Sequence, residues 1–255
     1  MTSNVLNYIA NLPVGAETTR FAETDDAAVP TGVDPDHIPD GIVTGTNLVE
    51  FAGDVDPVLR SSVAMSLLAA QRVANQDVVV ADPDQWMERH NTVLKNLNWV
   101  VESGGKVAQS FEKLDVAVHE AIIPLLTAAL GGAAAGTSLI AKALEQMKQV
   151  NQDTPWITLF DRESRRFNVS EYHFTRVTTD QDRVRMNLAA ARFDATFGRK
   201  QVLFFKVTQQ HATFEMASAG MAADAVLLKM TNEALKTKLA TLTNAFIQEL
   251  DLGPL

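Results

Sequence analysis

The sequence predicts an α+β protein in which an antiparallel sheet of three to five strands is flanked by helices, with a helical hairpin and a long C-terminal helix. Three observations support this fold class. Apolar residues recur at helical spacing between residues 57 and 149, alternating strand patterns with short turns follow between 165 and 216, and a leucine stripe runs from 221 to 250.

The elements of the first half are helices. Asp56 and Pro57 form an N-cap and first turn, and the dense apolar pattern of residues 58–76 predicts an internal helix. A second helix is expected to begin near Asp82 or Asp84 and to end at Gly104 and Gly105. A strand is expected over residues 106–114.

The second half changes character. Strands are expected over residues 166–177, 183–193 and 200–216, with short turns that favour antiparallel hairpins. The last element is a helix over about 221–250. Its apolar stripe consists of Leu228, Leu235, Leu239, Leu242, Phe246 and Leu250.

The charge is distributed unevenly. The net charge of the 255 residues is −9, and residues 1–56 carry all of it, with ten acidic residues against Arg20. Residues 1–56 are therefore predicted to be an acidic extended arm packed on the body, and residues 57–255 a single α+β domain. Residues 161–206, with ten bases and six acids, are the expected docking surface for this arm. The negative total argues against a nucleic-acid partner.

Composition excludes several classes of protein. With 46% apolar residues and no cysteine, the chain has no disulfide framework, zinc-thiolate site, catalytic cysteine or S-acylated anchor. The start lacks the pattern of a classical signal peptide. We expect a soluble protein that is cytoplasmic or released by a non-classical or dedicated secretion route.

The most unusual segment is residues 121–141, which contain no charged residue. A 21-residue helix is long enough to cross a bilayer core of about 30 Å. Because only seven of these residues are Leu or Ile, which supply roughly −3.5 kcal/mol of insertion free energy, a permanent span is not predicted. The pattern instead predicts a hairpin of two apolar helices within 115–149. The expected membrane-contacting residues are Ile122, Ile123, Leu125, Leu126, Leu130, Gly131, Gly132, Gly136, Leu139 and Ile140.

Two interpretations of this hairpin stay open. Small residues at these spacings also allow close helix packing inside an ordinary core. A segment that enters a membrane only conditionally must be hidden in the same way beforehand, so both interpretations predict the same folded structure.

Other candidate sites are weaker. Asp34, Asp36 and Asp40 suggest a weak cation loop, although the twelfth position counted from Asp34 is Gly45 where an EF-hand has Glu. No catalytic motif, phosphate-binding loop or other metal pattern occurs in the sequence. We therefore expect no cofactor and no metal site, and the lack of a catalytic motif leans against an enzyme.

The late region resembles a known family. FNVSEYHF, the strand QVLFFKVTQQ and a long closing helix, following a Gly- and Ala-rich apolar hairpin, resemble the small insect-virulence factors of plant-pathogenic bacteria. The hairpin is also similar to the membrane-seeking element of helical pore-forming toxins. Lipid attachment in the virulence family uses a cysteine, which this chain lacks, so no functional residue is transferred.

Two functions follow as hypotheses. The first is a non-enzymatic, membrane-active or lipid-contacting virulence or toxin-like effector that uses the hairpin 115–149, with the lipid membrane as its partner. The alternative is a structural or assembly protein that binds a protein partner, or itself as a homo-oligomer, through the acidic arm.

Overall fold

The computed structural model describes residues 2–14, 32–76, 83–111, 118–131, 138–146, 154–164, 170–194 and 212–252. Its helices are α1 (Thr2–Ala10), α2 (Pro57–Ala74), α3 (Pro83–Asn96), α4 (Val118–Ala129), α5 (Leu139–Gln146), α6 (Pro155–Ser164) and α7 (Ala225–Phe246). Its strands are β1 (Gly41–Thr44), β2 (Asn47–Phe51), β3 (Val100–Phe111), β4 (Ser170–Asp180), β5 (Arg183–Asp194), β6 (Ala212–Asp224) and β7 (Ile247–Glu249).

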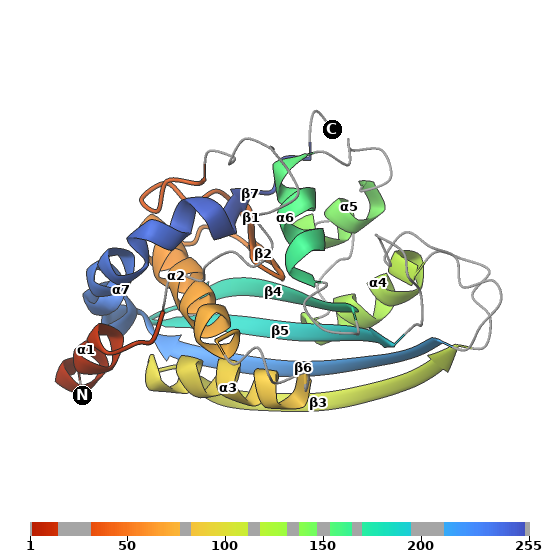
Figure 1. Cartoon of the computed structure of the whole chain (residues 1–255), viewed down its shortest axis with the longest axis horizontal. Coiled ribbons are helices and arrows are strands. Elements are labelled where there is room, and N and C mark those ends of the chain that lie inside the picture. Colours follow the sequence, from red (N-terminus) through yellow and green to blue (C-terminus); the bar gives the residue numbers. More distant parts are fainter. Residues whose placement is uncertain are drawn as a thin grey trace.

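The described strands form one seven-stranded sheet in the order β3-β6-β5-β4-β2-β1-β7 (Figure 1). All neighbouring strands are antiparallel except β2 and β4, which are parallel. The α+β class is confirmed, whereas the prediction of a three- to five-stranded antiparallel sheet is wrong. The sheet is larger because β1, β2 and β7 extend it beyond β4.

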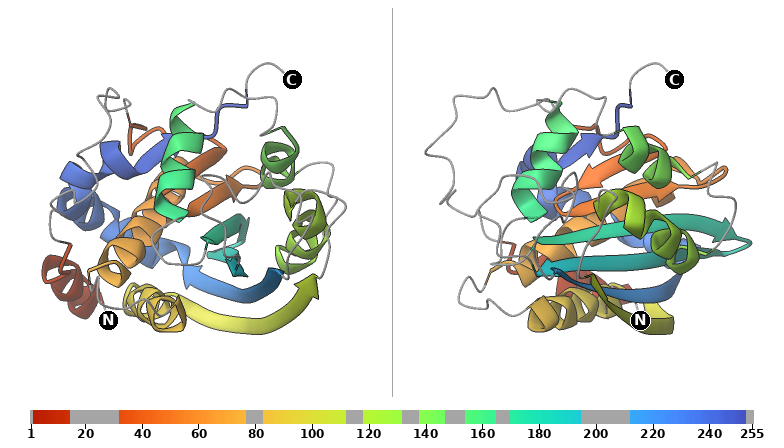
Figure 2. Two further views of the ribbon diagram at one scale, coloured as in Figure 1. Left: turned by 45° about the vertical axis from the view of Figure 1, so that its right-hand side comes forward. Right: turned by 90° about the vertical axis from the view of Figure 1, so that its right-hand side faces the viewer.

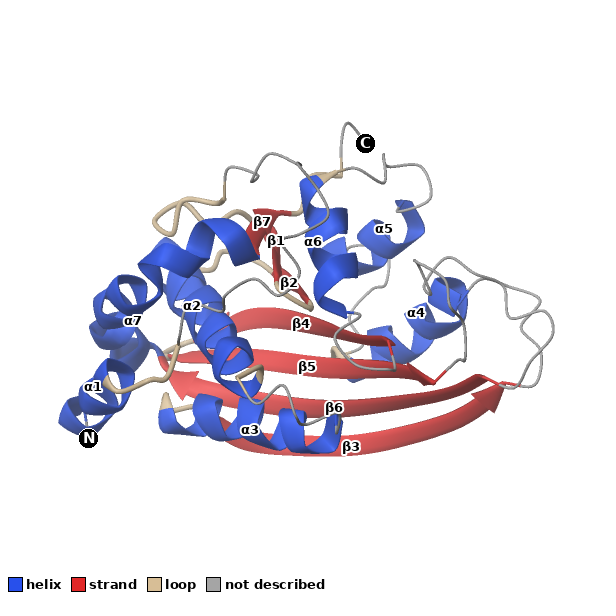
Figure 3. Ribbon diagram, viewed as in Figure 1, coloured by secondary structure: helices blue, strands red, loops and turns tan. Residues whose placement is uncertain are grey.

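Helices cover both faces of the sheet (Figures 2 and 3). Buried residues of α1, α2, α3 and α7 form one apolar core with residues such as Val177, Val184 and Met186. Buried residues of α4, α5 and α6 form a second core with Leu48, Phe174 and others on the opposite face. Because successive strand residues point to opposite faces, β4 contributes to both cores.

Helix α2 agrees with the prediction from sequence. The Asp56 carboxylate accepts hydrogen bonds from the backbone N–H groups of Val58 and Leu59, and Pro57 occupies the first turn. Nearly all of its side chains are buried, including the polar residues Ser62 and Ser66. These two hydroxyls donate to backbone carbonyls one turn earlier, which satisfies them inside the core.

Helix α3 begins where predicted but ends earlier. Trp86, Val93, Leu94 and Leu97 are buried, whereas Val100 and Val101 are exposed and belong to β3. The helix ends at Asn96, and Asn98 adopts a positive φ of 70°. Asn is one of the few residues that accept this left-handed conformation, so the helix ends there and Gly104 and Gly105 lie within β3.

The late strands match the prediction only in part. β4 and β5 form the expected hairpin, closed at Gln181 with a φ of 51°. The third predicted strand begins within residues 195–211, which lie outside the described part. β6 continues to Asp224, so residues 221–224 are strand where a helix was predicted. Pairing with β3 on one side and β5 on the other outweighs the helix preference of its alanines.

Residues 1–56 contribute to the sheet as well as to its surface. α1 packs against α7, and β1 and β2 lie between β7 and β4. All residues of these two strands are buried. Residues 15–31 of the predicted arm lie outside the described part of the chain.

Candidate functional site

The structure places two helices in the predicted hairpin segment. α4 and α5 contact each other, and they pack on β5 and β2 respectively (Figure 1). Of the predicted membrane-contacting residues, Gly132 and Gly136 lie outside the described residues. The side chain of Ile122 is also outside the description.

The inner face of this hairpin is part of the second core. Leu126 and Leu130 of α4 and Ile140 and Leu144 of α5 are buried, and they contact residues such as Phe174. Each helix therefore has an apolar side against the sheet, as the sequence pattern predicts.

The outer face of the hairpin's first helix, α4, is unusual because residues 123–131, whose exposure is described, carry no charge there. Between 123 and 131, Pro124, Ala128 and Gly131 are exposed, and Ile123 and Leu125 are half-buried. Helices on a protein surface normally carry charged or polar residues on the side that faces water. This helix instead presents proline, alanine and aliphatic side chains to solvent.

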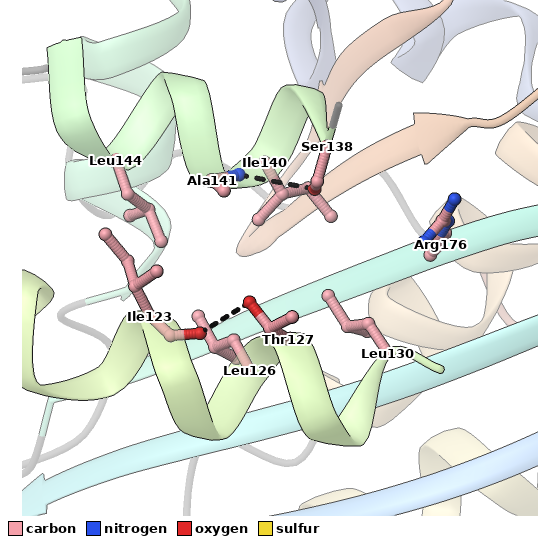
Figure 4. A pocket seen from close by; sticks show the side chains of 9 residues that line it. All are labelled: Ile123, Leu126, Thr127, Leu130, Ser138, Ile140, Ala141, Leu144 and Arg176. Carbon is pink, nitrogen blue, oxygen red and sulfur yellow. Dashed lines mark hydrogen bonds between the residues drawn. The ribbon is translucent and has the colours of Figure 1, made fainter. Parts of the chain in front are cut away.

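A small apolar cavity lies between the two helices (Figure 4). It has about 320 Å³ of empty space, part of which is open to solvent. Six aliphatic side chains line it, and Ser138, Thr127 and Arg176 supply its polar atoms. Thr127 donates its hydroxyl to the Ile123 carbonyl, so that hydroxyl is already used within α4.

The N-terminus of α5 is held by a carboxylate from the sheet. Glu50 of β2 accepts hydrogen bonds from the Ser138 hydroxyl at 2.6 Å and from the Ile140 backbone N–H at 3.2 Å. Arg176 of β4, paired with Glu50 in the strand register, places its Nε 3.4 Å from the other carboxylate oxygen. The Glu50 side chain is only 3% exposed and that of Arg176 is 16% exposed.

This arrangement, which we name the Glu50 anchor, has a clear physical basis. The first N–H groups of a helix have no partner within the helix, and a negative charge there is favoured by the helix dipole. Ser138 also accepts a 3.4 Å hydrogen bond from the Ala141 N–H, as an N-cap residue does. A remote strand thus completes the cap of α5.

A second contact holds the C-terminus of α4. The Asn187 amide on β5 donates to the Leu130 carbonyl at 3.3 Å. Gly131 follows with a φ of 100°, a conformation that favours glycine after a helix. A side chain at Gly131 would also approach the Asn187 amide to 3.0 Å. The start of α5 and the end of α4 are therefore both bound by polar side chains of the sheet.

Within the described ranges, none of the helices has both the length and the apolar character that a span across a bilayer requires. α4 has 12 residues, which corresponds to about 18 Å along its axis.

The acidic residues of the predicted cation loop bind groups of the chain itself. Asp36 lies 2.6 Å from Lys236 of α7, Asp40 pairs with Arg60 of α2, and Asp34 lies 2.7 Å from the His37 ring. Hydrogen bonds from the Asp36 N–H and from the His37 ring lower the pKa of the Asp34 carboxyl. The bond between His37 and Asp34 also raises the pKa of His37. Among the described residues, no group of three or more His, Asp or Glu side chains is placed to hold a metal ion.

The described carboxylates of the arm pair mainly with bases of helices. Asp56 pairs with Lys229 of α7 at 2.7 Å, and this hydrogen bond lowers the pKa of Asp56. Hydrogen bonds with Asp36 and Glu233 raise the pKa of Lys236. The arm reaches the basic region 161–206 through the pairing of β2 with β4 and through the Glu50–Arg176 ion pair.

Sequence reasoning missed Glu50, Arg176 and Asn187 as functional candidates. Glu50 was counted with the acids of the arm, and Arg176 with the bases of the sheet region. The available signal was the position of Glu50 inside NLVEF, where a single charge interrupts a short apolar strand. Such a charge is rarely buried without a partner.

Comparisons with known proteins give structural matches only. No protein-family model matches the chain, and no curated protein matches it. A delta-endotoxin structure is similar at 16% identity, with 71% of this chain and 85% of that chain covered and a TM-score of 0.42.

Two further structures are similar to the chain. The Evf virulence factor matches at 15% identity over 97% of this chain and 91% of its own, with a TM-score of 0.41. The activated Cyt2Ba monomer from Bacillus thuringiensis subsp. israelensis matches at 14% identity over 71% and 98%, with a TM-score of 0.35. These three structures are of a virulence factor and of toxins, the kinds of protein that the sequence resembles.

Proposed function

We propose that this chain is a non-enzymatic, lipid-contacting effector of the virulence or toxin type, in which α4 and α5 leave the sheet and enter the membrane interface. The observation that carries the proposal is the uncharged outer face of residues 123–131, with Pro124 and Ala128 exposed and Ile123 and Leu125 half-buried. The virulence or toxin character is what the sequence resemblance implies.

The energetics favour an interfacial position over a span. A helix of about 18 Å does not cross a hydrocarbon core of about 30 Å. It can lie at the boundary between headgroups and acyl chains, with its apolar side buried there. Leu126 and Leu130, which are buried against the sheet, would exchange one apolar environment for another. Their burial therefore opposes release far less than it would in water.

The polar contacts at the hairpin ends oppose release. The Glu50 anchor and the Asn187–Leu130 contact must break before the helices separate from the sheet. The hairpin is thus stable on the sheet in water, and it leaves the sheet when lipid replaces the apolar core around it.

The test is binding to vesicles of phosphatidylcholine and phosphatidylglycerol, measured by flotation and by dye leakage at pH 7 and pH 5. The variant Ala128→Glu adds a charge at an exposed position of α4, so the fold tolerates it. Ala240→Glu makes the same change at an exposed position of α7 and is the matched control. A charge costs about 3 kcal/mol at the bilayer centre and less toward the interface, so Ala128→Glu should weaken vesicle binding by up to about a hundredfold.

The outcomes are distinct. Binding by the wild type and by Ala240→Glu, together with loss in Ala128→Glu, supports the proposal. Equal binding by both variants would show that α4 does not contact lipid. A wild-type chain that neither floats nor causes leakage at either pH would refute membrane contact altogether.

The alternative function is not favoured by a contact in the described structure. Within the described part of the arm, Asp36, Asp40 and Asp56 pair with bases of the same chain. These carboxylates would have to exchange their present partners before they could bind another protein.

A further inference from the structure

Three aromatic rings stack in a buried cluster between α3 and the sheet. The centroid of the Trp86 ring lies 4.7 Å from the ring centroid of His173 on β4, with an interplanar angle of 20°. It lies 5.0 Å from the ring centroid of His90, with an interplanar angle of 19°. The two imidazoles are 6.2 Å apart. We name this group the histidine stack.

The stack connects four elements. The Trp86 indole N–H donates to Asn75, the C-cap of α2, at 2.7 Å. The His173 Nδ1 lies 2.7 Å from the Thr46 hydroxyl in the turn between β1 and β2. Because α3, α2, that turn and β4 all meet at these side chains, a change in the stack affects how α3 is held.

His90 is poorly provided for a positive charge. It is 2% exposed, and its Nε2 has no hydrogen-bond partner among the described residues. Its Nδ1 is 3.4 Å from the Asn91 amide oxygen. Protonation would place a new N–H at Nε2 with no acceptor, inside the core, which is unfavourable.

The groups around His90 do not compensate such a charge. The titratable group that faces it from β4 is His173, which would repel it if charged. The residues of α2 and of the β1–β2 turn that hydrogen-bond to the stack, Asn75 and Thr46, are uncharged. On α3 itself, Glu88 is exposed and Arg89 is half-buried. Arg72 of α2 lies over the Phe246 ring at 4.1 Å.

We infer that the histidine stack is an acid-sensitive joint, in which protonation of His90 releases α3 from α2 and the sheet. The inference goes beyond the proposed function and does not depend on membrane contact. It concerns the opening of α3 in the isolated chain.

The direction of the effect follows from linkage. Burial, with a smaller contribution from His173, lowers the pKa of His90 from 6.5 to about 3 in the folded chain. Because the open form then binds more protons than the closed form between these two values, acid favours the open form. Going from pH 7 to pH 5 should raise the ratio of open to closed α3 about 25-fold.

The test is hydrogen exchange of the full chain, followed by mass spectrometry at pH 7 and pH 5 and corrected for the intrinsic effect of pH. We expect the protection of residues 83–96 to fall about 25-fold between pH 7 and pH 5 and to stay below that of α7 at both pH values, because α3 opens before the chain unfolds. His90→Phe keeps an aromatic ring that cannot be protonated, so it should abolish most of this fall. His37→Phe makes the same change at an exposed histidine and should leave the fall unchanged.

Two results would overturn the inference. One is equal corrected protection of residues 83–96 in the wild type at both pH values, a measurement that requires no variant. The other is a folded His90→Phe chain that still loses protection of α3 as the wild type does.

Discussion

Neutralising Glu50 is the sharpest test of how the hairpin is held. The variant Glu50→Gln keeps the size of the side chain and removes its charge. In the wild-type chain, the Glu50 carboxylate accepts two hydrogen bonds from the start of α5 and lies 3.4 Å from the Nε of Arg176. We expect the variant to weaken the attachment of α5 to the sheet more than it weakens the attachment of any other element.

The magnitude can be worked from these contacts. Removing one member of a buried ion pair costs about 3–5 kcal/mol, because the remaining charge stays buried. Arg176 is 16% exposed, so water reduces this cost. The glutamine oxygen still accepts one hydrogen bond from α5, although without the extra strength of a charged acceptor. We therefore expect a loss of about 2–4 kcal/mol in the free energy of unfolding.

The assay has a global and a local part. Denaturant unfolding measures the total loss, and hydrogen exchange of residues 139–146 measures the opening of α5. Glu215→Gln neutralises an exposed carboxylate paired with Arg192 and should cost less than about 1 kcal/mol. Equal stability of Glu50→Gln and Glu215→Gln, with unchanged exchange in α5, would refute the anchoring role of Glu50.

Three further predictions follow from single contacts. Asn187→Ala removes the hydrogen bond to Leu130 and should cost about 1 kcal/mol, with faster exchange of residues 118–129; unchanged exchange there would contradict the role of Asn187. Raising salt from 0.05 to about 1 M screens exposed pairs such as Asp36–Lys236, so protease cleavage within residues 32–40 should accelerate, and equal cleavage at both salt concentrations would count against docking by charge. In a His37→Phe chain, which lacks the opposing effect of the raised pKa of His37, unfolding stability should fall by about 2 kcal/mol between pH 7 and pH 5, because the pKa of His90 is lowered to about 3 in the folded chain; the lowered pKa of Asp56 acts only below about pH 4. Flat stability of this variant over that range would show that His90 is protonated without opening.

The parts of the fold that local sequence determines were predicted well. Asp56 and Pro57 define the start of α2 through contacts within three residues, and the apolar spacing of α3 identifies Trp86 as buried. The β4–β5 hairpin is also local, since its turn spans Asp180 to Arg183. In each case the interacting residues are close in the chain, so their types report the structure directly.

The parts that depend on distant contacts were not predicted. β1 and β2 have four and five residues among Asp, Gly and Thr, a composition typical of turns. They are strands because β2 pairs in parallel with β4, where Asn47 is opposite His173. Sequence alone does not indicate this pairing, so the sheet is larger than expected.

The candidate site shows the same division. The uncharged run 121–141 identified the hairpin, because absence of charge is a local property. Its anchors were missed because Glu50 is 88 residues from Ser138, and Asn187 is 57 residues from Leu130. The histidine stack joins His90 to a residue on another element in the same way, and neither histidine has a distinctive local pattern.

The β2–β4 pair connects the two features of the molecule that we consider functional. His173 and Arg176 lie three residues apart on β4, and their partners in β2 are Asn47 and Glu50. Three residues along a strand reverse the face, so His173 points toward α3 and Arg176 toward the hairpin. A shift of this pair by one residue would exchange the faces and remove both contacts at once. The register of one parallel strand pair therefore determines whether the histidine stack and the Glu50 anchor can form, although they lie on opposite sides of the sheet.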